Sequence, residues 1–257
     1  MMISTLNIKK PPLLEPPKNQ PTIHPTELGE NDQKIIEETL EGARQHRKGE
    51  KIAAIHYYTE KTEGLKKTNE NAWKTAKTRQ EDEGKIREAL EGARGVEYGI
   101  GIGDIHFLTS KTENATATEV SADDREIIKG DIKIFREAEN GLNIAWIHHL
   151  TRNTEGLEKT EITPEDQQII QKSLQKARDE GKGDEVAFIH YLTRNIEGLK
   201  STKINQQDQQ IIHESLEQHR REKNGEVIAK IHYLSREIAK HQQQQEQTQE
   251  LPPLKKI

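Results

Sequence analysis

Five histidines recur along the chain, each placed 24 residues after an aspartate. A carboxylate that orients an imidazole is the core of many general-base sites, and imidazole nitrogens are common zinc ligands. The recurrence therefore raises three possibilities, which are a catalytic dyad, a metal site and a structural contact. The pairs are Asp32 and His56, Asp82 and His106, Asp124 and His148, Asp166 and His190, and Asp208 and His232.

The spacing of these pairs identifies an internal repeat. Successive aspartates are 42 residues apart, except for a step of 50 between the first two copies. A fixed period of this size is the signature of a repeat architecture. We therefore predict one repeat domain over residues 28–240. Its five copies span 28–68, 81–118, 119–160, 161–202 and 203–240, and an insertion occupies 69–80.

The sequence of each copy predicts two successive helices. In the fourth copy the first helix begins at a capping sequence over 163–166, where a threonine precedes an acidic residue by three positions. Ile170 and Leu174 then follow at helical spacing. We expect Gly183, which has a counterpart in every copy, to supply the positive φ that separates the two helices.

The second helix of each copy carries apolar residues on two faces. In the fourth copy Val186 and Ile189 lie on one face, whereas Ala187 and Tyr191 point nearly opposite. Such a helix must lie between two layers, so its own partner helix covers one face and the next copy covers the other. The sequence therefore predicts an all-α fold, an α-solenoid-like array of five helical hairpins.

Composition agrees with this extended arrangement and predicts disordered ends. Only 31% of the residues are hydrophobic and 4% aromatic, which is little for one compact core of this length. Residues 1–27 contain six prolines and predict a disordered arm. Residues 241–257 are glutamine-rich and contain prolines, so they predict a disordered tail, into which we expect the last helix to continue.

Charge and residue usage exclude several classes of function. A net charge of −5 gives no electrostatic basis for binding nucleic acid or an anionic membrane. The absence of cysteine excludes disulfides and thiol chemistry. No segment has the length and apolarity of a membrane span or a secretory signal, so we expect a cytoplasmic location or leave the compartment unassigned. We expect no cofactor.

The recurrent histidine is best interpreted as structural. Equivalent helices in neighbouring layers lie roughly 8–10 Å apart, too far for two imidazoles to approach one zinc ion at its usual distance of about 2 Å. Within one hairpin, Asp166 lies at the first turn of its helix and His190 lies roughly a turn and a half away. No nucleophile occupies a recognisable elbow, so we expect neither a metal site nor an enzyme. Each histidine is expected to hydrogen-bond an acceptor in the neighbouring copy.

One edge of the last three copies remains a candidate binding site. There a histidine and an arginine four residues later predict a cationic stripe for an acidic peptide or a phosphate. Glu60 and Ser110 occupy the arginine position in the first two copies. The alternative is that each arginine pairs with a nearby glutamate such as Glu155 or Glu197. The candidate residues are His148, Arg152, His190, Arg194, His232 and Arg236.

These patterns predict a non-catalytic scaffold or adaptor that binds another protein or an acidic peptide, by analogy with other helical repeat arrays. Two alternatives stay open. The first is a structural protein that self-associates through its last copy, because no following hairpin would cover Tyr233 and Ile238. The second is a secreted bacterial effector that binds a host protein.

Overall fold

The structure, a computed structural model, describes residues 21–72 and 76–250, and this part of the chain contains helices and no strands. The predicted all-α class and the five hairpins are confirmed. Each hairpin pairs α1 with α2, α4 with α5, α6 with α7, α8 with α9, or α10 with α11. The helices are α1 Asp32–Gln45, α2 Gly49–Lys61, α3 Thr68–Ala72, α4 Ala76–Gly95, α5 Gly99–Lys111, α6 Ala122–Glu137, α7 Gly141–Asn153, α8 Pro164–Asp179, α9 Gly183–Asn195, α10 Asp208–Arg221 and α11 Gly225–Glu250.

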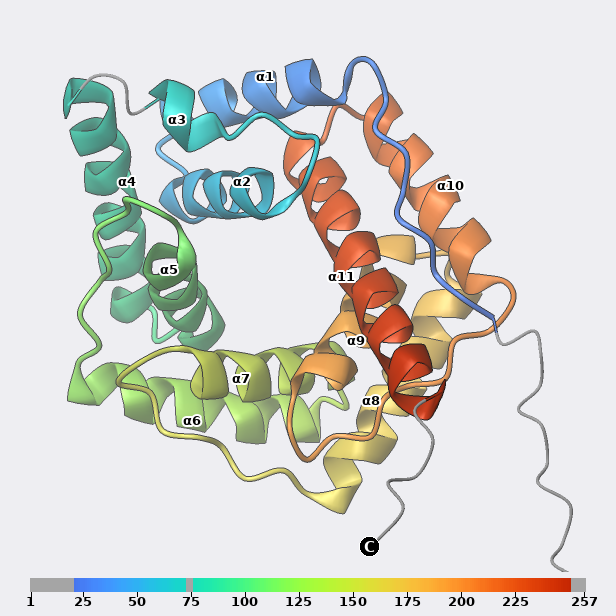
Figure 1. The fold of residues 1–257 in the computed structure, drawn as a ribbon. Helices are drawn as coiled ribbons and strands as arrows, with labels where there is room; N and C mark the ends of the chain where they lie inside the picture. Colours follow the sequence, from blue (N-terminus) through green and yellow to red (C-terminus); the bar gives the residue numbers. More distant parts are fainter. Residues whose placement is uncertain (1–20, 73–75, 251–257) are drawn as a thin grey trace, which may run out of the picture.

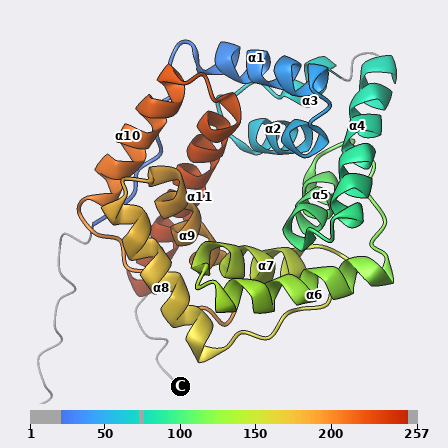
Figure 2. The same ribbon diagram turned by 180° about the vertical axis from the view of Figure 1, so that it is seen from behind.

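The five hairpins close into a ring. The second helix of each hairpin lies on the inside of the ring and the first helix on the outside (Figure 1). Helix α11 packs against α9 and also against α2, so the last hairpin lies beside the first one, as the view from behind also shows (Figure 2). The expectation of an uncovered last copy is wrong, since Tyr233 is 7% and Ile238 0% exposed. Self-association through this copy stays a prediction, without that argument in its favour.

The segment before α1 completes the closure. Residues 21–29 run beside α10 and α11 (Figure 1). There the backbone N–H of Ile23 donates to Gln242 Oε1 at 3.1 Å, and that of Thr26 donates to Ser235 Oγ at 3.0 Å. Ile23 is buried. The predicted disorder over 1–27 is therefore wrong for residues 21–27, while residues 1–20 lie outside the described part of the chain.

Two other boundaries differ from the sequence prediction. Helix α11 continues to Glu250, so most of the predicted disordered tail at 241–257 is helical, as the expected extension of the last helix implied. Residues 251–257 lie outside the described residues. The insertion at 69–80 forms most of α3 and the first turn of α4, which begins at Ala76.

The starts of α6 and α8 follow the predicted capping. In α8 the Thr163 side chain accepts from the Asp166 backbone N–H, while the Asp166 carboxylate accepts from the Thr163 N–H. Ser121 and Asp124 form the same reciprocal pair in α6. Each pair satisfies two backbone donors that a helix start leaves free.

The fixed glycine has a different role from the predicted one. The positive φ between α8 and α9 belongs to Gly181, at 67°, two residues before Gly183. A Cβ on Gly183 would instead lie 2.3 Å from the Ile211 carbonyl oxygen of α10 in the next hairpin. Glycine is needed there because the inner helix packs directly on the backbone of the next outer helix. The equivalent glycines that make this approach are Gly49, Gly99, Gly141 and Gly225.

Replacing Gly183 with alanine should destabilise the ring. The added methyl group has no room against α10, and overpacking of this kind costs about 1–3 kcal/mol. Gly84→Ala is the matched control, because nothing lies within 4 Å of a Cβ added there in mid-helix α4. It should leave stability unchanged or raise it by up to about 1 kcal/mol. Urea unfolding of both variants measures the difference, and equal stabilities would contradict the packing argument.

Candidate functional site

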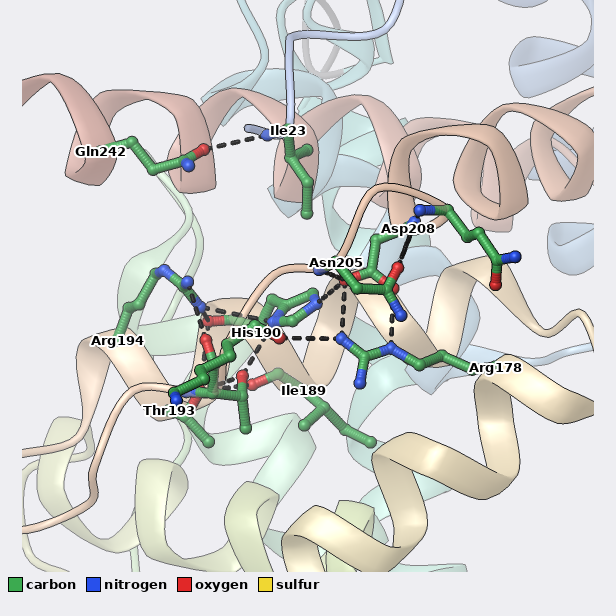
Figure 3. Close-up of polar contacts among 12 residues, drawn as sticks. Ile23, Arg178, Ile189, His190, Thr193, Arg194, Asn205, Asp208 and Gln242 are labelled. Carbon is green, nitrogen blue, oxygen red and sulfur yellow. Dashed lines mark hydrogen bonds and ion pairs between the residues drawn. The ribbon is translucent and has the colours of Figure 1, made fainter. Parts of the chain in front are cut away.

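The recurrent histidine lies between one hairpin and the next. His190 extends from α9 toward Asp208, the first residue of α10, and its Nε2 lies 2.9 Å from Asp208 Oδ2 (Figure 3). Its Nδ1 lies 2.8 Å from the hydroxyl oxygen of Thr202. Because an ionised carboxylate only accepts, Nε2 carries the proton and Thr202 donates to Nδ1. Both ring nitrogens are thereby occupied, and His190 is fully buried.

The same aspartate receives an arginine from the preceding hairpin. Arg178 of α8 donates from Nε to Oδ1 and from Nη2 to Oδ2 of Asp208, both at 2.7 Å (Figure 3). The backbone N–H of Asn205 adds a further donor at 2.8 Å. Burial alone would raise the pKa of Asp208, but the hydrogen bonds from His190 and Arg178 hold it below its usual range. Asp208 is therefore a charged acceptor shared by two hairpins.

All five junctions of the ring use this arrangement. The fifth junction joins the last hairpin to the first. There His232 Nε2 lies 2.8 Å from Asp32 Oδ2, and Arg220 donates to the same carboxylate. The Thr26 hydroxyl lies 2.7 Å from His232 Nδ1. The predicted contact between each histidine and the neighbouring copy is confirmed. The acceptor of each histidine is the aspartate of the next copy. The histidine and the aspartate of the same copy, which alone were compared in the sequence, do not meet. The other junctions are His56, Asp82, Arg44 and Thr68; His106, Asp124, Arg94 and Thr118; and His148, Asp166, Arg136 and Thr160.

The junction histidines are neutral. Burial lowers the pKa of His148 to about 4, against the opposing hydrogen bond to Asp166. Arg136 supplies the cation that the carboxylate needs, so the imidazole serves as a neutral donor and acceptor. An arrangement that is buried and fully hydrogen-bonded can fix the geometry of the ring, and it offers no free atom to a ligand.

Of the residues in the predicted cationic stripe, the arginines therefore remain as candidates for ligand binding and the histidines do not. The structure places His148, His190 and His232 out of reach of any partner, because each is fully buried. Arg152 and Arg194 are half-buried near the C-terminal ends of α7 and α9.

These arginines donate to backbone carbonyls. Arg194 donates to His190 O at 2.9 Å and to Thr202 O at 3.0 Å, and Arg152 and Arg236 make the equivalent contacts. Over residues 21–72 and 76–250, no carboxylate lies within ion-pair distance of Arg152, Arg194 or Arg236, so the alternative pairing with Glu155 or Glu197 does not form. Burial lowers the pKa of all three guanidinium groups.

Aromatic residues of all five copies meet inside the ring. The Tyr233 hydroxyl lies 3.0 Å from those of both Tyr57 and Tyr191, although these residues belong to the first, fourth and fifth copies. In the third copy His149 takes this position and stacks on Trp146 at 5.1 Å between centroids. In the part of the chain that the structure describes, no three His, Cys, Asp or Glu side chains group in a way that could hold a metal ion.

Sequence reasoning missed a repeat position inside the ring that carries two charged and two aromatic residues. Asp104, Trp146, Phe188 and Lys230 are spaced by 42 residues and so occupy one position of the repeat, where the first copy has Ala54. The signal was available, because a position that holds the fold keeps its residue type in every copy whereas this one changes each time. Asp104, Trp146 and Phe188 lie near the middle of α5, α7 and α9. Arg152 and Arg194 lie in the last turn of α7 and α9, whereas Arg236 lies near the middle of the longer α11.

Comparisons with protein-family models, with curated proteins and with solved structures give no match to this chain. None of the helices described here is both long and apolar enough to cross a membrane.

Acidification should destabilise the ring well above the pH at which its carboxylates titrate. The pKa of His148 falls from 6.5 to about 4 on folding, so the unfolded chain takes up protons first. Stability is then fully present above about pH 6.5 and is lost progressively as the pH falls toward 4. Asp166, whose pKa is about 2, adds a further loss below the unfolded value of 3.8. Urea midpoints measured from pH 8 to pH 4 test this, and a flat profile over that range would show that the histidines are not buried as neutral groups.

Proposed function

We propose that the chain is a non-catalytic binding protein, a closed helical ring that binds an acidic segment of another protein along Arg152, Arg194 and Arg236. The observation that carries the proposal is that, within the described residues, no carboxylate lies within ion-pair distance of three half-buried guanidinium groups on three consecutive copies. A buried charge without a counterion is destabilising, and an incoming carboxylate would relieve that cost. Every repeated histidine and aspartate is already used at a junction, whereas these arginines bond neutral carbonyl oxygens and no carboxylate within the described residues.

The chemistry of the three groups suits a carboxylate. Each guanidinium has five N–H donors. Arg194 uses its two Nη atoms on carbonyl oxygens, and among residues 21–72 and 76–250 its Nε has no acceptor. The carbonyl contacts hold the side chain in place before a ligand arrives, which lowers the entropic cost of binding. A charge-assisted hydrogen bond to a carboxylate is roughly twice as strong as a neutral one.

Spacing defines the ligand more closely. Neighbouring packed helices lie about 8–10 Å apart, and an extended peptide advances about 3.3 Å per residue. Carboxylates at every third residue of an extended segment therefore match arginines on successive inner helices. The row ends at the first copy, where Glu60 occupies the arginine position and pairs with Lys61 at 2.6 Å.

The test is the affinity of the full chain for a labelled peptide with glutamate at every third position, measured by fluorescence anisotropy. Replacing Arg152, Arg194 and Arg236 with glutamine should weaken binding by about tenfold or more, because each lost charge-assisted contact is worth roughly 1.5–3 kcal/mol before the peptide readjusts. The matched control replaces the exposed Arg47, Arg87 and Arg221, which changes the net charge equally. Equal losses in the two variants would contradict a specific row and leave only non-specific charge attraction.

A further inference from the structure

The loop that follows the inner helix carries an aliphatic side chain at one fixed position, three residues before the junction threonine. In the first, third and fourth copies this residue is a leucine that packs against the core of the ring: Leu65, Leu157 and Leu199. The second copy has Ala115 at the same position. An alanine side chain is three carbon atoms shorter, so it cannot fill the space that a leucine fills in the other loops.

A cavity of about 240 Å³ lies beside this alanine, between α4 and the loop of the second copy. We call it the Ala115 cavity. Ile86 and Leu90 of α4 line it together with Ala115 and Ala117, so its wall is largely apolar. An apolar cavity of about 150 Å³ can already hold a benzene molecule, so the space is sufficient for a leucine side chain. Arg87 also lines the cavity and is exposed, which shows that the cavity opens to solvent.

Hydrogen bonds keep the loop from closing over this space. The backbone N–H and the hydroxyl of Thr116 both donate to Glu83 Oε1 of α4, at 3.3 and 2.9 Å. Two residues later the backbone N–H of Thr118 donates to the Thr109 hydroxyl at 3.3 Å. Because the loop is fixed at both of these residues, it can relax only partly into the missing volume.

The fifth copy shows that the aliphatic side chain can come from a remote segment. Ile23, which precedes α1, lies three residues before the junction threonine Thr26 and is 1% exposed. Beside it the backbone N–H of His24 donates to Gln209 Oε1 of α10 at 2.8 Å, across 185 residues of sequence. The leucine-bearing loops of the first and fourth copies make the equivalent contact with their own outer helices. The ring therefore already accepts this side chain from a segment outside the hairpin that it fills.

We propose that the Ala115 cavity takes a leucine or isoleucine side chain from a partner polypeptide. The other four copies define this occupant, because each fills the equivalent position with one of these two residues. Burial of such a side chain removes apolar surface from water and raises affinity by roughly tenfold to a hundredfold. The Ala115 cavity shares no residue with the arginine row, so either site can fail without the other.

Methyl NMR spectra of the intact chain test the proposal. The probe is acetyl-Gly-Leu-Gly-amide, which has no carboxylate for the arginine row, and the same peptide with alanine in place of leucine is its control. The leucine peptide should shift the methyl signals of Ile86 and Leu90, and the alanine peptide should bind about tenfold or more weakly because it buries less apolar surface. Equal affinities, or no shift with the leucine peptide, overturn the proposal. Shifts with 3-methylbutan-1-ol but not with the peptide also overturn it, since the cavity is then a site for free small molecules.

Two substitutions move the site between copies. Ala115→Leu fills the cavity from the chain itself and should abolish the shifts at α4. Leu199→Ala opens the equivalent space in the fourth copy, so the leucine peptide should then also shift the methyl signals of Ile170 and Leu174 of α8, which hold the corresponding positions. Shifts at α4 that persist in Ala115→Leu, or the absence of new shifts at α8 in Leu199→Ala, overturn the assignment of the occupant.

Discussion

The architecture depends on one buried aspartate carboxylate in each copy. Asp208 closes the cap of its own helix through Asn205, accepts the forked guanidinium of Arg178 and accepts the imidazole of His190. The first contact belongs to its own hairpin and the other two to the preceding one, so local helix formation and contact between hairpins depend on the same two oxygens. Removing a buried charge partner from such a group is costly, which explains why the arginine and the histidine recur at each junction, whereas the capping residue differs between copies.

Closure of the ring follows from the same constraint. An open array would leave the first aspartate without its arginine and histidine, and the last histidine without its threonine. The fifth junction supplies both sets of partners. Arg220 and His232 donate to Asp32, and Thr26 takes the place of the threonine that follows the inner helix in the other copies. The aromatic contacts of Tyr57 and Tyr233 then fill the centre of the ring from its first and last copies.

The sequence predicted the parts of the fold that depend on local pattern. Helical periodicity and capping residues such as Thr163 identified the helices, because these signals act within a few residues. Ring closure was missed, since it depends on a curvature that accumulates over five copies and on a contact between positions 26 and 232. The function of Gly183 was misjudged for the same reason, because its constraint comes from α10 in the next hairpin and not from its own turn.

The candidate sites divide in a similar way. The spacing of the arginines was visible in the sequence, but their lack of carboxylate partners depends on how the loops fold back. The histidines drew attention because they recur, yet recurrence marked the residues that hold the hairpins together.

The central claim, that the ring is closed by a fifth junction equivalent to the other four, can be tested with two single substitutions. Thr26 and Thr160 donate to His232 and His148 through equivalent contacts of 2.7 Å, and both are buried. Valine at either position keeps the volume and leaves an imidazole nitrogen unsatisfied, at a cost of about 1–3 kcal/mol. Urea unfolding should therefore give similar losses of stability for Thr26→Val and Thr160→Val. A loss in Thr160→Val alone would contradict the closed ring.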